Sequence, residues 1–252
     1  MVERMIDLPP VIGHRGVAAR APENTLGGLA RAAEEGLEWV EFDVRLAGDD
    51  VPVVLHDRSL ARTTGVDRLI DEVRSTDLGA FDAGSWFDTV WSGERVPTLV
   101  QALDACIVLG LTPNVEIKAD GGGLVTLARR VTGIIRSRWP AGRQRPLVSS
   151  FSLMALYHAR LAGYRWPLAL VMGCRLRRLW SWHAALLKCT SIHVDPSLAT
   201  PEFISRVHRG GRRIAVYTVN CADEARALMN SGVDSIVSDT PDFHRNSREA
   251  ER

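Results

Sequence analysis

The feature that most constrains the fold of this chain is a regular alternation of short apolar or β-branched segments with longer amphipathic ones. The longer segments carry apolar residues at i, i+3 and i+4, the spacing of helices packed on a sheet. This alternation predicts βα units around a parallel sheet. Eight barrel strands are expected, at Val11–Gly13, Val40–Val44, Asn114–Ile117, Leu147–Ser150, Leu168–Met172, Ile192–Val194, Ile214–Val219 and Ser235–Val237. Eight such strands in 252 residues fit a TIM (β/α)8 barrel, so the expected fold class is α/β.

Two segments depart from the simple βα rhythm. The strand-like run Val51–Leu55 follows the second strand after only four residues, too few for a parallel crossover, and is expected to fold back as an antiparallel hairpin arm. The segment 58–97 is long and contains many Asp, Gly and Trp residues. Because a structureless loop of that length is improbable, we expect a small insertion over one barrel end. No repeat or interdomain linker is visible, so residues 1–252 are expected to form one domain.

The expected helices are bounded by recognisable capping residues. Glycines at 36, 110, 163 and 232 stand where helices should end. Before the first helix, either Asn24 or Thr25 could serve as the N-cap. The helices are expected at Asn24–Glu35, Leu99–Val108, Leu124–Arg138, Leu153–Ala162 and Ala222–Asn230.

Composition excludes several classes of protein. The formal net charge of +1 provides no overall field for nucleic acid, and no nucleic-acid partner is expected. The four cysteines are scattered without a CxxC spacing, which indicates reduced thiols rather than a zinc site or disulfides. The N-terminal segment MVERMIDLPPVIG lacks the apolar core of a signal peptide, and no stretch has the length of a membrane span. A cytoplasmic location is therefore expected, and nothing in the sequence predicts an oligomeric state.

Three acidic residues stand near the ends of expected strands. Because side chains alternate along a strand, Glu41 and Asp43 share one face, and Glu116 and Lys118 share one face of the next barrel strand. The intervening residues are apolar and should face the helices, so these polar pairs should point into the barrel. Carboxylates there cost several kcal/mol unless paired or bound to a metal. The three acids predict an oxygen-rich site for a divalent cation, Mg²⁺ or Ca²⁺ with Mn²⁺ also suitable, whereas the alternative is structural salt bridges to Arg45 or Lys118.

Two histidines are expected at the same barrel end. His14, followed by Arg15, ends the first strand, and His56, followed by Asp57, ends the hairpin arm. Because the hairpin reverses the chain, His56 should return to the acids. Two imidazoles with pKa values near about 6.5 can serve as general base and general acid. Arg15 and Lys118 would balance the charge of phosphoryl oxygens.

At these residues the sequence resembles the glycerophosphodiester phosphodiesterases, a family of TIM barrels. The matching motifs run in the family's order over nearly the whole chain, so the resemblance is specific. They are His14-Arg15-Gly16, Glu23-Asn24-Thr25, Glu41-x-Asp43, His56-Asp57, Arg62-Thr63-Thr64-Gly65, Asp82-Ala83-Gly84-Ser85-Trp86-Phe87, Pro97-Thr98-Leu99, Glu116-x-Lys118 and Tyr217-Thr218-Val219-Asn220.

The resemblance implies a metal-dependent hydrolase that converts glycerophosphodiesters into sn-glycerol 3-phosphate and an alcohol such as choline, ethanolamine or glycerol. A substrate hydroxyl attacks phosphorus in the route usually drawn for relatives, and direct attack by water is equally compatible with these residues. Tyr217 stands where many bacterial members carry Trp and is expected to contact substrate. The implied roles are a cation held by Glu41, Asp43 and Glu116, acid–base catalysis by His14 and His56, and phosphate contacts from Arg15 and Lys118.

The segment Cys174–Lys188 is the least similar to the family. Its arginines are interspersed with Trp and Leu residues. This pattern is typical of a helix that binds weakly to anionic lipid, and equally of an ordinary barrel helix with a basic, solvent-exposed edge. Contact with a membrane would make a lysophospholipase D the alternative enzymatic function. A non-catalytic phosphate-binding barrel is a further alternative, although binding alone does not require two imidazoles.

Overall fold

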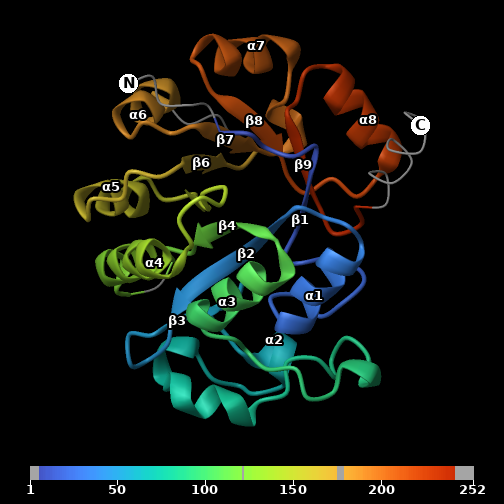
Figure 1. Ribbon diagram of the computed structural model, residues 1–252, viewed down its shortest axis with the longest axis vertical. Helices are drawn as coiled ribbons and strands as arrows, with labels where there is room; N and C mark the ends of the chain where they lie inside the picture. The colour runs from blue at the N-terminus through green and yellow to red at the C-terminus, as the bar shows by residue number, and fades with distance from the viewer. Residues whose placement is uncertain (1–5, 121, 175–178, 242–252) are drawn as a thin grey trace.

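Eight parallel strands close into a barrel in the computed structural model, which describes residues 6–120, 122–174 and 179–241 (Figure 1). Strand pairing runs β1-β9-β8-β7-β6-β5-β4-β2, and pairing of β1 with β2 completes the ring. The predicted TIM barrel is confirmed. The barrel strands are β1 (Val11–Gly13), β2 (Trp39–Leu46), β4 (Thr112–Ile117), β5 (Leu147–Ser150), β6 (Leu168–Met172), β7 (Ser191–Val194), β8 (Arg213–Val216) and β9 (Ser235–Ser238).

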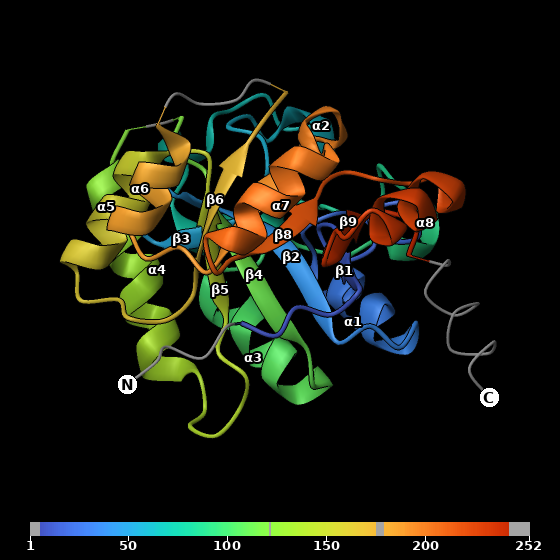
Figure 2. The ribbon, with the colours of Figure 1, turned by 90° about the horizontal axis from the view of Figure 1, so that it is seen from above.

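The hairpin arm is β3 (Pro52–Val54), which pairs antiparallel with β2 and places Val54 opposite Val44. On its other edge β2 pairs with β4 along six residues, and Asp43 stands directly beside Glu116 in that register. Figure 2 shows β2 and β4 running side by side through the centre of the molecule. The register brings the two acidic strands into one layer.

Helices surround the strands and pack their apolar faces on the barrel (Figure 1). Thr25 caps α1 by accepting a hydrogen bond from the Gly28 backbone N–H, and Gly110 ends α3 with φ of 76°, a conformation that glycine adopts without steric cost. The α-helices outside the insertion are α1 (Leu26–Glu34), α3 (Leu99–Leu109), α4 (Leu124–Arg138), α5 (Leu153–Leu161), α6 (Trp180–Leu186), α7 (Pro201–Arg209) and α8 (Ala222–Asn230).

Two predicted element ends lie two or three residues beyond the observed ones. The strand expected at Ile214–Val219 ends at Val216, the last of its residues that pairs in register with β7 (Val194) and β9 (Ile236). The first helix begins at Leu26 instead of Asn24, since Asn24 has φ of 58° and directs its side chain elsewhere.

The insertion at 58–97 consists of short helical turns around a small apolar cluster of their own. Leu60, Ile70 and Leu78 are buried there against Val53 and Leu55 of the hairpin arm. The insertion is therefore fastened to the arm that carries His56. Its turns are α2 (Ala61–Thr64), η1 (Ile70–Glu72), η2 (Ser75–Ala80) and η3 (Thr89–Trp91).

The segment predicted as a lipid-facing or ordinary barrel helix is described only in part. Arg175, Arg177 and Arg178 lie outside the described residues. In α6, Trp180 is buried against the barrel whereas Trp182 is exposed. Among the described helices, none combines the length and the hydropathy needed to cross a bilayer. Contact with a membrane surface stays a prediction.

The insertion cluster should contribute measurably to stability. Leu60→Ala, at a side chain with 0% exposure, is expected to lower the free energy of unfolding by about 2–5 kcal/mol because it leaves a cavity. Urea denaturation measures this. The matched substitution Val108→Ala, at a side chain that is 84% exposed, should change the free energy by less than about 0.5 kcal/mol. Equal effects of the two substitutions would contradict the assigned packing.

Candidate active site

Three buried carboxylates meet inside one end of the barrel. Ligand oxygens of Glu41, Asp43 and Glu116 all lie within 4.8 Å of one another. Glu41 and Asp43 project from the same face of β2, and the pairing of Asp43 with Glu116 brings in the acid of β4. The predicted convergence of the acids is therefore present.

The loop after β1 wraps tightly against this cluster. A Cβ added at Gly13 would lie 2.1 Å from the Gly16 carbonyl oxygen, and one added at Gly16 would lie 2.8 Å from the Gly28 backbone. Glycine at both positions lets the chain turn closely enough for the Arg15 backbone N–H to donate to Glu41 Oε2 at 3.1 Å. Close approach of the backbone therefore explains Gly16 of the His14-Arg15-Gly16 motif and Gly13 just before it.

Asn24 orients the central acid of the cluster. Its Nδ2 donates to Asp43 Oδ2 at 2.9 Å, and its Oδ1 accepts from the Asp43 backbone N–H at 3.1 Å. Helix capping falls to Thr25 instead. Of the two expected capping candidates, Thr25 is confirmed as the N-cap, whereas the contact of Asn24 with Asp43 was not predicted from the sequence. The signal in the sequence was the Glu23-Asn24-Thr25 motif, which is among the motifs that carry the family resemblance.

Basic side chains partly neutralise the acids. Lys118 Nζ lies 2.9 Å from Asp43 Oδ1 and 2.5 Å from Glu116 Oε1, and Arg15 Nε lies 3.3 Å from Asp43 Oδ2. The salt bridges to Lys118 that were expected as an alternative to metal binding are therefore present. Arg45, the other suggested partner, instead forms a bidentate pair with Asp120 at 2.8 and 3.0 Å.

The acids still lack one positive partner. Glu41 Oε1 is buried and has no hydrogen-bond partner among the described residues. Burial and the charge of Asp43 raise the pKa of Glu41 to about 8, and burial also raises the pKa of Glu116. Burial disfavours ionisation of Asp43 as well, but Lys118 and Arg15 hold its pKa well below the usual range. A divalent cation would supply the missing charge. Both the geometry and the chemistry of these oxygen donors therefore fit a metal ion.

His14 is oriented by an aspartate from the last strand end. Its Nδ1 lies 2.6 Å from Asp239 Oδ1, and its Nε2 lies 3.9 Å from Glu41 Oε2. Burial opposes protonation, but the hydrogen bond to Asp239 and the charge of Glu41 outweigh it and raise the pKa of His14. Asn220 Nδ2 holds the second Asp239 oxygen at 2.7 Å. Asp239 therefore links the imidazole of His14 to the amide of Asn220.

His56 has its own aspartate. Its Nδ1 lies 2.6 Å from Asp57 Oδ1, and Arg62 of the insertion donates to Asp57 Oδ2 at 2.6 Å. Arg62 also binds Glu23 at 2.7 Å, and Glu23 accepts from Arg15 at 2.8 Å. Burial lowers the pKa of His56. The two imidazoles therefore have opposite pKa shifts, and ion pairs join the surroundings of His56 to the loop after β1.

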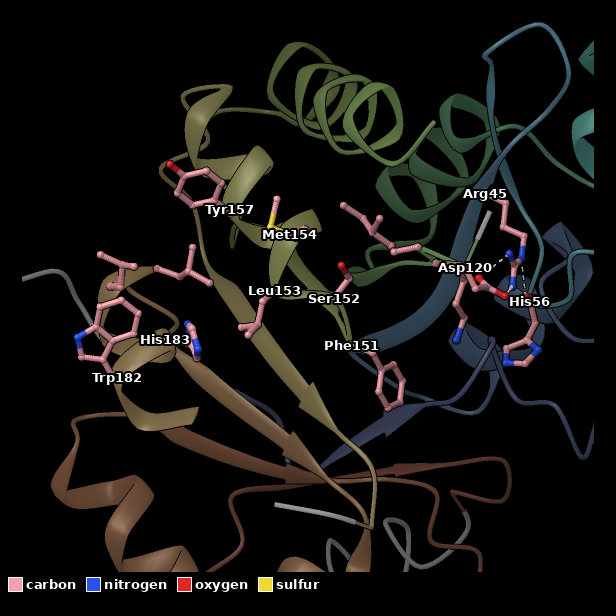
Figure 3. Close-up of a pocket in the computed structure, with 15 residues that line it drawn as sticks. Arg45, His56, Asp120, Phe151, Ser152, Leu153, Met154, Tyr157, Trp182 and His183 are labelled. Carbon is pink, nitrogen blue, oxygen red and sulfur yellow. Dashed lines mark hydrogen bonds and ion pairs between the residues drawn. The ribbon is translucent and has the colours of Figure 1, made fainter. Parts of the chain in front are cut away.

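Two aromatic rings flank the cluster. The Tyr217 hydroxyl donates to the Met172 carbonyl oxygen at 2.9 Å, and its ring meets Phe151 edge to face at 5.8 Å. Lys118 Nζ lies 5.8 Å from the centre of the Phe151 ring. The expected role of Tyr217 as a substrate contact stays a prediction, with its hydroxyl proton already engaged. Figure 3 shows Phe151 in a pocket that continues from His56 toward α5 and α6.

Comparison with known proteins identifies the family. The model of the glycerophosphoryl diester phosphodiesterase family matches residues 14–243. The chain belongs to this family. A phosphodiesterase of Oleispira antarctica, solved in complex with the product sn-glycerol-3-phosphate, is 32% identical and superposes with a TM-score of 0.91, covering 96% of this chain and 97% of its own. The predicted enzyme class, a phosphoric diester hydrolase, is confirmed by this membership.

Two further relatives support the same assignment. The glycerophosphodiester phosphodiesterase of Caldanaerobacter subterraneus subsp. tengcongensis is 29% identical, and the alignment covers 92% of this chain and 94% of that protein. The crystal structure of a glycerophosphodiester phosphodiesterase from Agrobacterium tumefaciens is 26% identical with a TM-score of 0.76, covering 94% of this chain and 98% of the other. The likeness therefore extends over whole domains rather than over isolated motifs.

The role of Asn24 can be tested separately from helix capping. Asn24→Ala should weaken binding of Mg²⁺ or Ca²⁺ by about 10–100-fold, because groups that orient metal ligands typically have effects of this size. Isothermal titration calorimetry measures the affinity. Thr25→Ala, its neighbour, should lower the free energy of unfolding by about 1 kcal/mol through loss of the cap and leave the cation affinity unchanged. Unaltered cation affinity in Asn24→Ala would contradict the assigned role.

Proposed function

We propose that this enzyme hydrolyses glycerophosphodiesters to sn-glycerol 3-phosphate and an alcohol at the end of the barrel that holds the three acids. The observation that carries the proposal is the meeting of Glu41, Asp43 and Glu116 within 4.8 Å, with His14 close by. Family membership and the product bound to the Oleispira antarctica relative support the same substrate class.

Glu41, Asp43 and Glu116 would hold a divalent cation, Mg²⁺, Mn²⁺ or Ca²⁺. The unpartnered Glu41 Oε1 and the raised pKa of Glu41 support this assignment, because both indicate a missing positive charge. When bound, such a cation supplies Lewis-acid polarisation of a phosphoryl oxygen. Asn24 and the Arg15 backbone keep two of the carboxylates in place.

His14 and His56 would move the protons of the reaction. Hydrolysis requires one proton to leave the attacking hydroxyl or water and one to reach the oxygen of the departing alcohol when its bond to phosphorus breaks. Asp239 and Asp57 each bind the Nδ1 atom of one imidazole, which leaves Nε2 available for proton transfer. The same pair serves attack by a neighbouring glycerol hydroxyl or by water.

Arg15 and Lys118 would bind the phosphoryl oxygens. Both cations already lie against the acids, with Lys118 2.9 Å and Arg15 3.3 Å from Asp43. Burial disfavours the charged form of Lys118, but the neighbouring carboxylates keep it protonated by raising its pKa. Positive groups fixed before substrate arrives stabilise the charge that develops on the phosphoryl group without reorganisation.

Removal of the cation should abolish turnover. Exhaustive treatment with EDTA is expected to lower hydrolysis of glycerophosphocholine by about a hundredfold or more, since several kcal/mol of charge stabilisation are lost. Release of sn-glycerol 3-phosphate is measured in a coupled dehydrogenase assay. EDTA saturated with Mg²⁺ is the control, and added Mg²⁺, Mn²⁺ or Ca²⁺ should restore the rate. Full activity after chelation would contradict the roles of the three acids.

Loss of either imidazole should impair chemistry more than cation binding. His14→Ala and His56→Ala are each expected to lower kcat by about 10²–10⁴-fold, the usual contribution of general acid–base catalysis. Calorimetric titration should show that both variants still bind the cation. His208→Ala is the matched control, because His208 pairs with Asp234 at the amino-terminal end of β9, and its activity should equal that of the unaltered enzyme. Rates close to normal in both site variants would exclude the acid–base assignment.

A further inference from the structure

A large groove extends away from the catalytic centre and is not used by the reaction described above. It has a volume of about 890 Å³, and His56 and Lys118 line one end of it. Its outer part runs between α5 and α6, which lie beside one another in both views (Figures 1 and 2). We call this outer part the α5–α6 groove; its lining residues are Leu153, Met154, Tyr157, Trp182, His183, Leu186 and Leu187.

The two ends of the pocket differ in chemical character. Arg45, Asp120 and His56 gather at one end in Figure 3, and Trp182 and Tyr157 lie at the other. The charges at the first end are those of the catalytic centre and of the Arg45–Asp120 ion pair. The α5–α6 groove itself is lined mainly by hydrocarbon, thioether and ring surfaces.

These apolar side chains are left in contact with solvent. Met154 is 55% exposed, Trp182 57% and Leu186 57%, although α5 and α6 both bury other residues against the barrel. Contiguous apolar surface beside a polar site is typical of ligand binding. The deacylated diester of the proposed reaction is polar throughout and gains nothing from such a wall.

Ser152 and Phe151 lie between the two ends of the pocket. Ser152 Oγ accepts from the Ala155 backbone N–H at 3.3 Å as the cap of α5. Phe151 stands at the junction, against Tyr217 on one side and 5.8 Å from Lys118 Nζ on the other. A molecule bound with its phosphate at Lys118 would therefore meet an aromatic ring and then an apolar channel.

We propose that the α5–α6 groove binds the single hydrocarbon chain of a lysophospholipid whose phosphodiester lies at the catalytic centre. The inference rests on the proposed function, since it places the scissile phosphate at Lys118 and the two histidines. The groove is continuous with that site, which favours a chain covalently attached to the substrate over a separate partner. The reaction is the same hydrolysis: water is consumed, the bond between phosphorus and the headgroup alcohol breaks, and the acylated glycerol phosphate and the free alcohol are released.

A series of substrates with one headgroup tests this proposal. The full-length enzyme with Mg²⁺ is assayed on glycerophosphocholine and on its 1-hexanoyl, 1-octanoyl and 1-decanoyl derivatives, all below their critical micelle concentrations, and released choline is measured. We expect kcat/KM to rise about fourfold for each methylene that enters the groove, because each is removed from water. Mass spectrometry of the decanoyl reaction should detect decanoylglycerol phosphate.

Matched variants locate the chain. Met154→Gln with Leu186→Gln should lower kcat/KM for the decanoyl substrate by about tenfold through lost apolar contact, and leave kcat/KM for glycerophosphocholine unchanged. Leu161→Gln with Val108→Gln is the control, because Leu161 and Val108 are 64% and 84% exposed and lie outside the groove. The control should retain the full dependence on chain length.

The outcomes separate the two proposals. Hydrolysis of glycerophosphocholine with no gain from the chain overturns the groove assignment and leaves the proposed function intact. The groove assignment is also overturned if the variant Met154→Gln with Leu186→Gln keeps the rise of kcat/KM with chain length. The same holds if this variant loses kcat/KM equally for the decanoyl substrate and for glycerophosphocholine. Failure to hydrolyse any of the four diesters overturns the proposed function and the inference together.

Discussion

Repulsion among three buried carboxylates is the constraint that shapes the end of the barrel where they meet. The side-by-side register of Asp43 and Glu116 on β2 and β4 makes the crowding unavoidable, and Glu41 adds to it from the same face of β2. Lys118, Arg15 and Asn24 each relieve part of it at Asp43. The residue that keeps an unpartnered oxygen is Glu41, so the whole arrangement favours the entry of one more positive charge.

The two histidines show a second organising rule. Each has an aspartate at Nδ1, but the aspartates come from different places: Asp239 follows β9, whereas Asp57 is the direct neighbour of His56. An imidazole supported in this way keeps a defined tautomer and orientation. His14 follows a strand of the barrel, and His56 follows the hairpin arm added to it. The reacting phosphate would therefore lie between the barrel and the arm.

Much of the barrel and of the site could be predicted because the alternation of side chains along a strand determines both which residues face the helices and which face the barrel interior. The alternation in Val40–Val44 places Glu41 and Asp43 on one face whatever the rest of the fold does. What a linear pattern does not contain is the direction of a side chain in a loop. Asn24 and Thr25 are equally good caps on paper, and only the left-handed backbone at Asn24 sends its amide to Asp43. The α5–α6 groove was not predicted for a related reason: the exposed faces of two helices form a channel only when their spacing is known.

The ion pairs from Arg62 to Glu23 and on to Arg15 connect the insertion with the loop that carries His14. Arg62 sits on a short helix held by a small apolar cluster, whereas the barrel has a far larger core. Warming should therefore loosen the insertion first and misalign Asp57 and Glu23 while the barrel is still intact. Catalysis in this enzyme would then fail at a lower temperature than the fold, and its thermal limit would be governed by the insertion, about a sixth of the chain, rather than by the barrel.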